Sequence, residues 1–512
     1  MSETTQSPKP QCRWYQFSMR TMLLVVSGVL TGCPNAPTVR KELPKAVVKG
    51  TSKPVEAESP KKVPITLPEP LPRDVVRAWE KAGAMVGWGG KINAGHLEFQ
   101  FMRHPPKFLL EPPELELTDA VPAFKLYGLK SGTVSTLPDP GTPFALSVVG
   151  SPVTDEGLKE LAGLRSLRIL AIYSSKVTDK GLKELAGLRS LRSLAIYNSK
   201  VTEKGLKELE MMKGLRDLVL HDHTGDLTEV GIIGLTKLKS LRSLAIRRWM
   251  ITDEGLMELA ELKDLQALGL ASTRLPHGGI EKLLRLKNLK SLDLANTRVA
   301  DAGIEKLSRL KNLKVLELAD TRVTDAGIEK LERLKGLQYL GLYRTQVTGK
   351  GLAGIRSLRY LNLCATKVSD AAMKELAKLL ELRSLDLTAT KVTDAGIKEL
   401  AELRNLQSLK LGGTIVTSEG LKALTRLENL QFLGLSNTKV TDAELHELAG
   451  LKNLRTLTLR HTEVTDGGMK ELEGLTNLRV LDVANTNVTD ARAKELQKTL
   501  PGCRIEYHNW IP

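Results

Sequence analysis

Several sequence features that would indicate catalysis or a membrane-spanning helix are missing from this chain of 512 residues. No segment matches the phosphate-binding loop G-x-x-x-x-G-K-[ST], and no G-x-S-x-G nucleophile elbow occurs. The apolar segment from Met22 to Leu30 would reach only about 14 Å as a helix, whereas the hydrocarbon core of a bilayer is about 30 Å thick. The sequence therefore offers no basis for an enzyme, and we expect a non-catalytic protein without a cofactor.

Aromatic residues are also scarce, at 4% of the chain, and most phenylalanines fall in one non-repeating region. Five of the seven lie between residues 73 and 145: Phe99, Phe101, Phe108, Phe124 and Phe144. The local pattern predicts a helix from about Asp74 to Met85 and short strands in LEFQF, LELT and AFKLYGL. We expect residues 73–145 to have an aromatic core of their own and to cap the open N-terminal edge of the structure that follows.

A phrase of 24 residues recurs from about residue 146 to residue 499, in about 15 copies. Twelve of the fourteen steps between copies are 24 residues long, one is 26 and one is 21. The position that marks each copy is Val, Ile or Leu: Val153, Val177, Val201, Leu227, Ile251, Leu275, Val299, Val323, Val347, Val368, Val392, Val416, Val440, Val464 and Val488. A fixed period of this size indicates a solenoid, in which each unit buries its apolar face against its neighbours.

Each unit reads as one strand followed by one helix. In the unit from residue 382 to 406, Leu385 and Leu387 alternate with polar residues as in a strand, and Ile397 and Leu400 recur at helical spacing. Thr393 and Asp394 are predicted to cap the helix. The recurrent Thr after each strand is predicted to bond the backbone of adjacent turns, and the Gly four residues after the marker to permit a close backbone approach.

The unit resembles the leucine-rich repeat family, whose L-x-x-L-x-L-x-x-N-x-L signature is matched over residues 146–507 with Thr in place of Asn. Its V-T-D-x-G-L segment is similar to the ribonuclease-inhibitor-like and cysteine-containing subclasses. The resemblance implies an α/β fold, a right-handed solenoid with a curved parallel sheet on the concave face and helices on the convex face. Residues 500–512 are then expected to form a C-terminal capping strand.

The N-terminal segment resembles the signal of a bacterial lipoprotein. Basic residues precede the apolar segment, which ends in Leu30-Thr31-Gly32-Cys33, similar to a lipobox. This resemblance implies that residues 1–33 are a signal peptide, that Cys33 carries the lipid, and that the protein is exported and anchored in the bacterial cell envelope, at the outer membrane or a periplasmic face. Translation from Met19 instead of Met1 would make a more compact signal. Residues 34–72 contain nine prolines within 39 residues and are predicted to be an extended tether.

The four cysteines do not form a disulfide framework. Cys12 would leave with the signal and Cys33 would be acylated. Cys364 and Cys503 are expected six strand spacings apart, about 29 Å, whereas a bridge requires Cα atoms within about 7 Å. No intrachain disulfide is predicted.

Two polar features have competing interpretations. His221, Asp222, His223 and Asp226 would suit a metal, but their 26-residue unit also suits a simple bulged loop, which we favour. The net charge is +16, and one basic residue per unit forms a stripe along one rim of the sheet: Lys176, Lys200, Arg274, Arg298, Arg322, Lys367, Lys391 and Lys439. A solvated rim and attraction to anionic envelope polymers both explain this stripe, and export argues against nucleic acid as its ligand.

The concave surface is where a partner is expected to bind. Strand positions that the leucine pattern leaves free carry large or charged side chains: Tyr173, Tyr197, His221, Arg247, Asp293, Glu317, Tyr339, Tyr343, Tyr360, Asn362, Asp386, Phe432 and Arg460. Tyrosines dominate many binding hot spots, although exposed strand positions favour aromatics anyway. Asp293 and Glu317 on neighbouring strands would repel each other unless a cation meets them, which predicts a ligand with some positive charge.

We therefore predict a membrane-anchored scaffold that binds a protein through its concave sheet. One alternative is recognition of a cell-wall glycan or an anionic envelope polymer. Another is an intracellular adaptor of the ubiquitin-ligase type, which would need an adaptor-binding domain in place of the predicted signal and tether.

Overall fold

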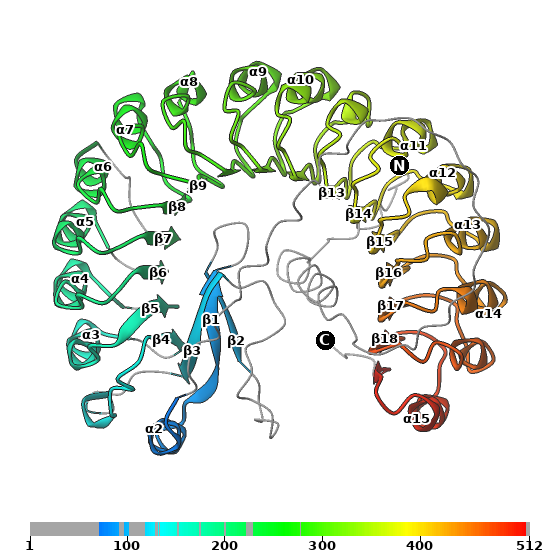
Figure 1. The fold of residues 1–512 in the computed structure, drawn as a ribbon, viewed down its shortest axis with the longest axis horizontal. Coiled ribbons are helices and arrows are strands. Elements are labelled where there is room, and N and C mark those ends of the chain that lie inside the picture. The colour runs from blue at the N-terminus through cyan, green and yellow to red at the C-terminus, as the bar shows by residue number, and fades with distance from the viewer. Residues whose placement is uncertain are drawn as a thin grey trace, which may run out of the picture.

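The computed structural model is a horseshoe, with strands along its inner edge and helices along its outer edge (Figure 1). It describes residues 71–91, 97–101, 118–127, 132, 134–150, 153–173, 176–198, 201–221, 229–276 and 278–507. Within these residues one continuous sheet contains nineteen strands, and its neighbours from β3 to β19 run parallel in sequence order. The predicted solenoid of strands and helices is thus confirmed. The signal with Cys33, residues 34–70 of the predicted tether, and Asp222, His223 and Asp226 lie outside the described residues. Leu71, at the end of the predicted tether, is buried in the core.

The repeat strands and helices have the following bounds. The strands are β4 Phe144–Val149, β5 Leu167–Ile172, β6 Ser193–Tyr197, β7 Asp217–His221, β8 Ser243–Arg247, β9 Ala267–Gly269, β10 Ser291–Asp293, β11 Val315–Glu317, β12 Tyr339–Gly341, β13 Tyr360–Asn362, β14 Ser384–Asp386, β15 Ser408–Lys410, β16 Phe432–Gly434, β17 Thr456–Thr458, β18 Val480–Asp482 and β19 Arg504–Glu506. The helices are α3 Asp155–Glu160, α4 Asp179–Leu185, α5 Glu203–Glu208, α6 Glu229–Thr236, α7 Asp253–Leu259, α8 Gly279–Leu283, α9 Asp301–Leu307, α10 Asp325–Lys330, α11 Asp370–Leu376, α12 Asp394–Glu399, α13 Ser418–Leu424, α14 Asp442–Leu445 and α15 Asp490–Thr499.

The core lies between the sheet and the helices. In the unit of β10, Leu292 and Leu294 point into this layer together with Ile304 and Leu307 of α9, and all four are fully buried. The same positions in neighbouring units continue this contact, so the buried side chains form one cluster along the whole arc. Side chains at alternate strand positions, such as Asp293, face the concave side instead.

The recurrent Thr closes the turn of its own unit. In ten successive units its hydroxyl donates to the carbonyl three residues earlier, as Thr273 does to Leu270, at 2.5–2.7 Å. The prediction that these hydroxyls bond adjacent turns is wrong. The residue before the Thr has a positive φ in most of these units, for example 53° at Asn296, and this turn brings the hydroxyl back to its own strand.

The Asp of T-D-x-G supplies the link between units that the Thr does not. Asp155 accepts both the amide (2.9 Å) and the hydroxyl (2.6 Å) of Thr178 in the next unit. The same pair of bonds recurs from Asp179, Asp301, Asp325, Asp370, Asp394, Asp442 and Asp466. The N-cap itself is the Thr, as at Thr178 on α4. The prediction that both Thr and Asp cap their own helix is therefore corrected for Asp.

This link explains the recurrent Gly. A Cβ at Gly396 would collide with the Asp370 carboxylate, and Gly181, Gly205, Gly327, Gly420 and Gly468 meet the Asp of the preceding unit in the same way. The close approach is confirmed, but it is to a side chain as much as to backbone.

At the two internal exceptions to the Gly pattern, the Asp of the preceding unit is replaced as well. Gly349 stands where an Asp would be, and the Cβ of Ala372 in the next unit approaches it closely. Ser418 replaces another Asp, and there Glu444 of the next unit accepts the Thr441 amide at 2.7 Å and hydroxyl at 2.6 Å. Ser418 in turn donates to Glu444 at 3.0 Å.

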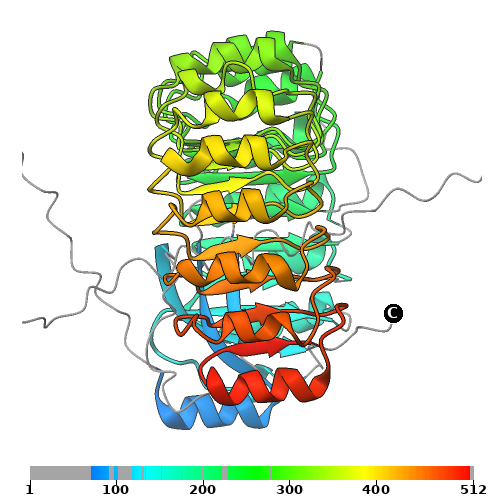
Figure 2. The same cartoon turned by 90° about the vertical axis from the view of Figure 1, so that its right-hand side faces the viewer.

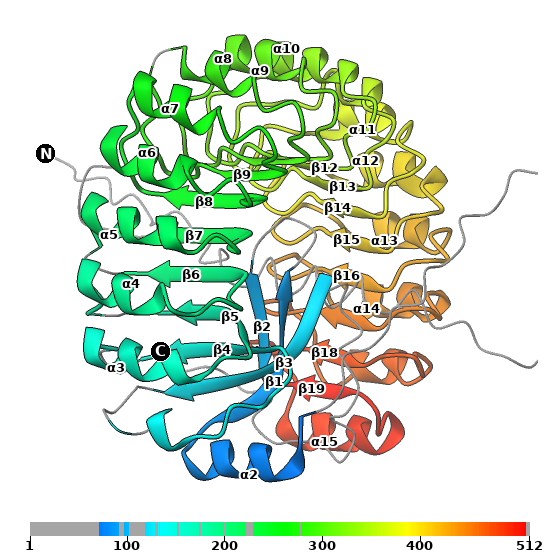
Figure 3. The ribbon, with the colours of Figure 1, turned by 60° about the vertical axis from the view of Figure 1, so that its left-hand side comes forward.

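The N-terminal region extends the sheet. It contains α2 (Arg73–Lys81), β1 (Met85–Lys91), β2 (Leu97–Phe101) and β3 (Thr118–Tyr127). The predicted helix ends earlier than expected, because Met85 already begins β1. β1 pairs antiparallel with β2 and β3, whereas β3 pairs parallel with β4 and so covers the first repeat strand. Figure 3 shows these strands turned steeply against the repeat strands.

Three described aromatic side chains of this region, Trp79, Phe124 and Phe144, pack together as part of the repeat core. Trp79 stacks on Phe124 with ring centroids 4.2 Å apart, and Phe144 meets both rings edge-on. The Trp79 indole donates to the Pro138 carbonyl at 3.0 Å. All three rings are fully buried and belong to the same cluster as the repeat leucines. The expectation of an independent core is therefore wrong for these three rings, which the repeat core includes. The side chains of Phe99, Phe101 and Phe108 lie outside the described part of the chain.

The 21-residue unit and the C-terminal end complete the arc. In the short unit the three-residue 3-10 helix η5 (Leu352–Gly354) takes the place of an α-helix. The two described cysteines, Cys364 after β13 and Cys503 before β19, are buried six strand steps apart and form no disulfide with each other. Among the described residues no helix is long and apolar enough to cross a membrane.

Candidate functional site

The concave surface consists of three columns of side chains that run across the strands. The first column includes Ser291, Val315, Tyr339, Tyr360 and Phe432, and the middle column lies two residues further on and includes Asp293, Glu317, Gly341, Asn362 and Asp386. The third column, two residues beyond the middle one, includes Tyr173, Tyr197, His221, Arg247, Tyr343 and Arg460. All thirteen side chains predicted to contact a partner therefore belong to one face of the sheet.

An aromatic stack lies at the N-terminal end of the third column. The rings of Tyr173 and Tyr197 are 4.4 Å apart and nearly parallel, at 5°. His221 follows on the next strand, 5.6 Å from the Tyr197 ring. All three are partly exposed. Because the adjacent middle column carries only small buried residues such as Ala171 and Ala195, these rings stand above an apolar floor.

The C-terminal part of the middle column is polar, and most of its side chains bond the backbone of their own unit. Five of them accept a hydrogen bond from the amide two residues further on, at 2.9–3.1 Å: Asp293 from Ala295, Glu317 from Ala319, Asn362 from Cys364, Asp386 from Thr388 and Asp482 from Ala484. These amides lie just beyond the strand ends, where the sheet ladder no longer satisfies them. The acids on this face thus terminate strands in addition to any part in binding.

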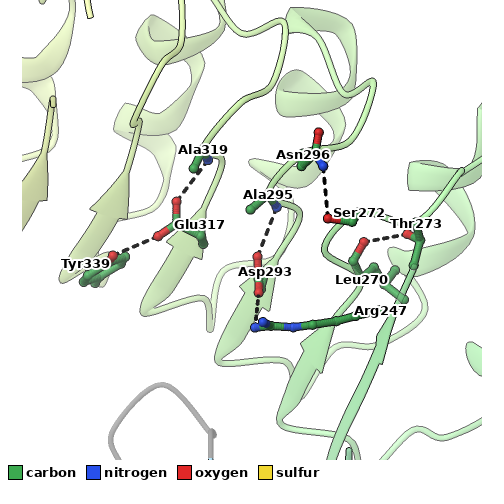
Figure 4. Close-up of polar contacts among 10 residues, drawn as sticks. All are labelled: Arg247, Leu270, Ser272, Thr273, Asp293, Ala295, Asn296, Glu317, Ala319 and Tyr339. Carbon is green, nitrogen blue, oxygen red and sulfur yellow. Dashed lines mark hydrogen bonds and ion pairs between the residues drawn. The ribbon is translucent and has the colours of Figure 1, made fainter. Parts of the chain in front are cut away.

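The remaining oxygen of each of these acids finds a partner within the chain. Arg247 pairs with Asp293 at 3.0 Å, Lys410 with Asp386 at 3.3 Å, and Arg460 with Asp482 at 3.4 Å. Glu317 instead accepts the Tyr339 hydroxyl at 2.8 Å. Figure 4 shows Arg247 reaching Asp293 and Tyr339 reaching Glu317. The cation that we expected a ligand to bring to the Asp293–Glu317 pair is therefore supplied at Asp293 by the chain itself.

Glu317 differs from the other acids because a phenol, not a cation, meets it. Its carboxylate lies over Gly341, where a Cβ would collide with both oxygens. Burial, with the neighbouring Asp293 charge as the second cause, raises the pKa of Glu317 to about 7. Burial and the Glu317 charge in turn raise the pKa of Tyr339 well above its usual value. This pair consequently carries a proton that titrates near neutral pH.

The tyrosines on either side of the short unit do not form one cluster. Tyr339 and Tyr360 are register partners in the first column. Tyr343 lies in the third column, where it packs against Ala319 and its neighbours, with Arg344 at 5.8 Å from its ring. Phe432 is only 2% exposed and Asp386 only 6%, so a partner would reach them only after neighbouring side chains move.

The candidate metal site at His221 and the predicted basic stripe that begins at Lys176 have less support as ligand sites. No group of three or more His, Cys, Asp or Glu side chains in the described part of the chain is placed to hold a metal, and the companions predicted for His221 lie outside that part. Lys176, Arg274, Arg298 and Arg322 of the predicted stripe are exposed. However, Lys176, Arg298 and Arg322 are each followed three residues later by Asp179, Asp301 and Asp325, which balance the charge of that rim.

Sequence reasoning missed the contact of Arg247 with Asp293, two strands away. Gly269 stands in the middle column of the strand between them, so no side chain blocks the path of the guanidinium. Gly341 makes the same room for Glu317. A glycine in a column of otherwise larger residues was the sequence feature that could have predicted a side chain reaching across from a neighbouring strand.

These observations define the class of the protein: a solenoid of stacked strand–helix units with an open concave sheet. Residues 350–504 match the family described as "Leucine-rich repeat region", and residues 285–308 and 309–331 match "Leucine Rich repeat". Together with the strand–helix architecture, these matches support the leucine-rich repeat family, and the fold is a leucine-rich repeat solenoid.

Two of the solved structures to which this chain is similar are bacterial proteins. An internalin from Listeria monocytogenes is 25% identical, with a TM-score of 0.47, over 64% of this chain and 88% of the internalin. A leucine-rich repeat protein of Leptospira interrogans is 23% identical, with a TM-score of 0.47, over 70% of this chain and 95% of that protein. No curated protein matches the sequence.

Proposed function

We propose that this chain is a non-catalytic, lipid-anchored scaffold of the cell envelope that binds a protein partner through its concave sheet. The observation that carries the proposal is the concave face itself. Its stacked Tyr173, Tyr197 and His221 and its charged residues Arg247 and Arg460 are partly exposed, whereas the links between units are made elsewhere, by Asp and Thr. Rigid aromatic rings and arginines are the residue types that dominate protein–protein hot spots.

Capture from solubilised envelopes tests the concave face. We expect Tyr173→Ser with Tyr197→Ser to lose proteins that the unchanged chain retains, because both rings stand on the partly exposed surface. Met211→Ser with Met257→Ser is the matched control, since both methionines are exposed, at 69% and 38%, and lie on the helix side of the arc. A retained set that is the same for the unchanged chain and the tyrosine variant would contradict the proposal.

The membrane anchor rests on the sequence Leu30-Thr31-Gly32-Cys33 at the end of an apolar segment. Growth with a palmitate analogue should label the unchanged protein and leave Cys33→Ala unlabelled. Label that persists in Cys33→Ala, or its absence from the unchanged protein, would rule out lipidation at this residue. The concave capture experiment does not depend on this result.

A further inference from the structure

The loops that lead from each helix to the next strand are strongly basic in eight consecutive units. These loops are residues 163–168, 187–192, 211–216, 237–242, 261–266, 285–290, 309–314 and 333–338. They contain eighteen Lys or Arg residues and only two acids, Glu261 and Asp264. The eighteen, which we call the basic rim, are Arg165, Arg168, Arg189, Arg192, Lys213, Arg216, Lys237, Lys239, Arg242, Lys263, Arg285, Lys287, Lys290, Arg309, Lys311, Lys314, Arg333 and Lys335.

The basic rim is accessible and mostly uncompensated. Fifteen of its eighteen side chains are exposed, and the other three, Arg168, Arg192 and Arg242, are partly exposed. Four form ion pairs: Lys237 with Glu210, Arg242 with Asp264, and both Lys263 and Arg285 with Glu261. The remaining fourteen have no ion pair among the described residues. Like charges packed this densely repel one another and raise the electrostatic free energy of the folded chain. An anionic partner would reduce this repulsion.

The geometry of the solenoid places these charges on one side. Every helix-to-strand loop lies at the same end of its unit. The units stack level with one another, so these ends lie on one side of the arc, as Figure 2 shows from the edge of the horseshoe. The strand starts along this edge are about 4.8 Å apart, as in any sheet. The basic rim therefore follows the curve of the arc within one plane. The opposite side of the horseshoe carries the strand-to-helix loops, whose cations alternate with Asp179, Asp301 and Asp325.

We infer that the basic rim is a docking surface for an anionic lipid membrane. A flat bilayer contacts every unit of a flat band at once, whereas a linear polyanion would have to bend along the arc to do so. Each Lys or Arg near an anionic bilayer adds to the attraction, and the additions accumulate over a surface of this size. The solenoid would then lie with one flat side on the membrane, and its concave sheet would open parallel to the surface. The inference goes beyond the proposed binding of a protein partner, and it does not depend on lipid at Cys33.

Vesicle sedimentation tests the docking surface. The full chain carrying Cys33→Ala, which has no lipid, is mixed with vesicles of phosphatidylcholine alone or with phosphatidylglycerol added. We expect binding only to the anionic vesicles and loss of binding as salt rises from about 0.1 M to 1 M, since the Debye length falls from about 10 Å to about 3 Å. Reversal of four rim charges, Arg165→Glu, Arg189→Glu, Lys213→Glu and Lys239→Glu, should lower the partition coefficient by about 100-fold or more.

A matched variant separates the rim from net charge. Lys176→Glu, Arg274→Glu, Arg298→Glu and Arg322→Glu reverse the same number of exposed charges on the opposite flat side. This variant should lose less than about 10-fold, because its charges lie further from the bilayer. Replacement of the same four rim residues by Gln provides a milder variant if charge reversal impairs folding, and it should still bind more weakly than the matched Gln variant of the opposite side.

Three results would overturn the inference. The first is equal loss in the two charge-reversed variants, which would mean that net charge alone drives binding. The second is failure to bind anionic vesicles at about 0.1 M salt. The third is binding to soluble polyphosphate without binding to vesicles, which would assign the rim to a linear polyanion. None of these results bears on the concave capture experiment, so the two proposals can fail separately.

Discussion

At the scale of single residues, the polar side chains of this protein are distinguished by which neighbour each one meets. Asp293, Glu317, Asp386 and Asp482 of the middle column each accept a strand-end amide, but of these four only Glu317 has a phenol in place of a cation at its second oxygen. Its raised pKa follows from that difference, because burial and Asp293 both penalise the charged form.

Glu317 should make stability depend on pH. The folded protein holds this proton more tightly than the unfolded chain, since the pKa rises from 4.5 to about 7 on folding. The contribution of Glu317 is therefore fully present below about pH 4.5 and is lost as the pH rises through about 7. Glu317→Gln keeps a carbonyl that accepts the Ala319 amide, and its NH2 group can donate to the Tyr339 oxygen. This variant should be more stable than the unchanged protein at pH 8, by about 1–3 kcal/mol, and similar at pH 4.5.

Urea unfolding at the two pH values measures this effect. The control is Glu305→Gln, which removes an exposed carboxylate from the neighbouring unit. If Glu317→Gln and Glu305→Gln shift the midpoints equally at pH 8, the coupling of Glu317 to folding is refuted.

At the scale of elements, consecutive helices are joined at their N-termini by the Asp–Thr link, and most units carry Gly beside the linking carboxylate. The chain itself contains two natural exchanges, Gly349 with Ala372 and Ser418 with Glu444, in which both members of the pair differ. These two sites predict an energetic coupling between Asp and Gly, whereas the Asp466–Thr489 link forms with Arg492 at the Gly position.

A double-mutant cycle at Asp370 and Gly396 should reveal this coupling. Gly396→Ala alone should cost about 1–3 kcal/mol, because its Cβ displaces the Asp370 carboxylate that holds Thr393. Asp370→Gly alone loses the two bonds to Thr393. The double variant, which copies the natural Gly349–Ala372 pair, should be more stable than the sum of the single effects by at least about 0.5 kcal/mol. Gly336→Ala is the control, since its Cβ would meet nothing within 4 Å. Strict additivity in thermal unfolding would argue against the coupling.

At the scale of the whole molecule, stability is distributed along the arc, because most contacts of a unit are with its immediate neighbours. The ends are the exception. β3 and α2 cover the first repeat strand, and Trp79 fills the junction between them and the repeat core.

Loss of the Trp79 ring should therefore loosen one end and spare the other. Trp79→Ala removes a fully buried ring that stacks on Phe124, a change that costs about 3–5 kcal/mol in well-packed cores. We expect hydrogen exchange to accelerate in β4, β5 and β6, while β14 to β18 keep their protection. Uniform acceleration across the arc would show that the array unfolds as one cooperative body.

The sequence by itself determined the architecture: the 24-residue period, the strand and helix in each unit, the buried leucines and the concave face that carries the predicted partner residues. It could do so because a solenoid makes its contacts between near neighbours, so a local pattern repeated fifteen times already describes the packing. Only the tertiary structure decided how side chains from different units meet. Asp155 binds the next unit's Thr178, Arg247 passes Gly269 to reach Asp293, and Trp79 joins the repeat core. These contacts depend on side-chain reach and direction across neighbouring strands, which the spacing of residues along one chain does not contain.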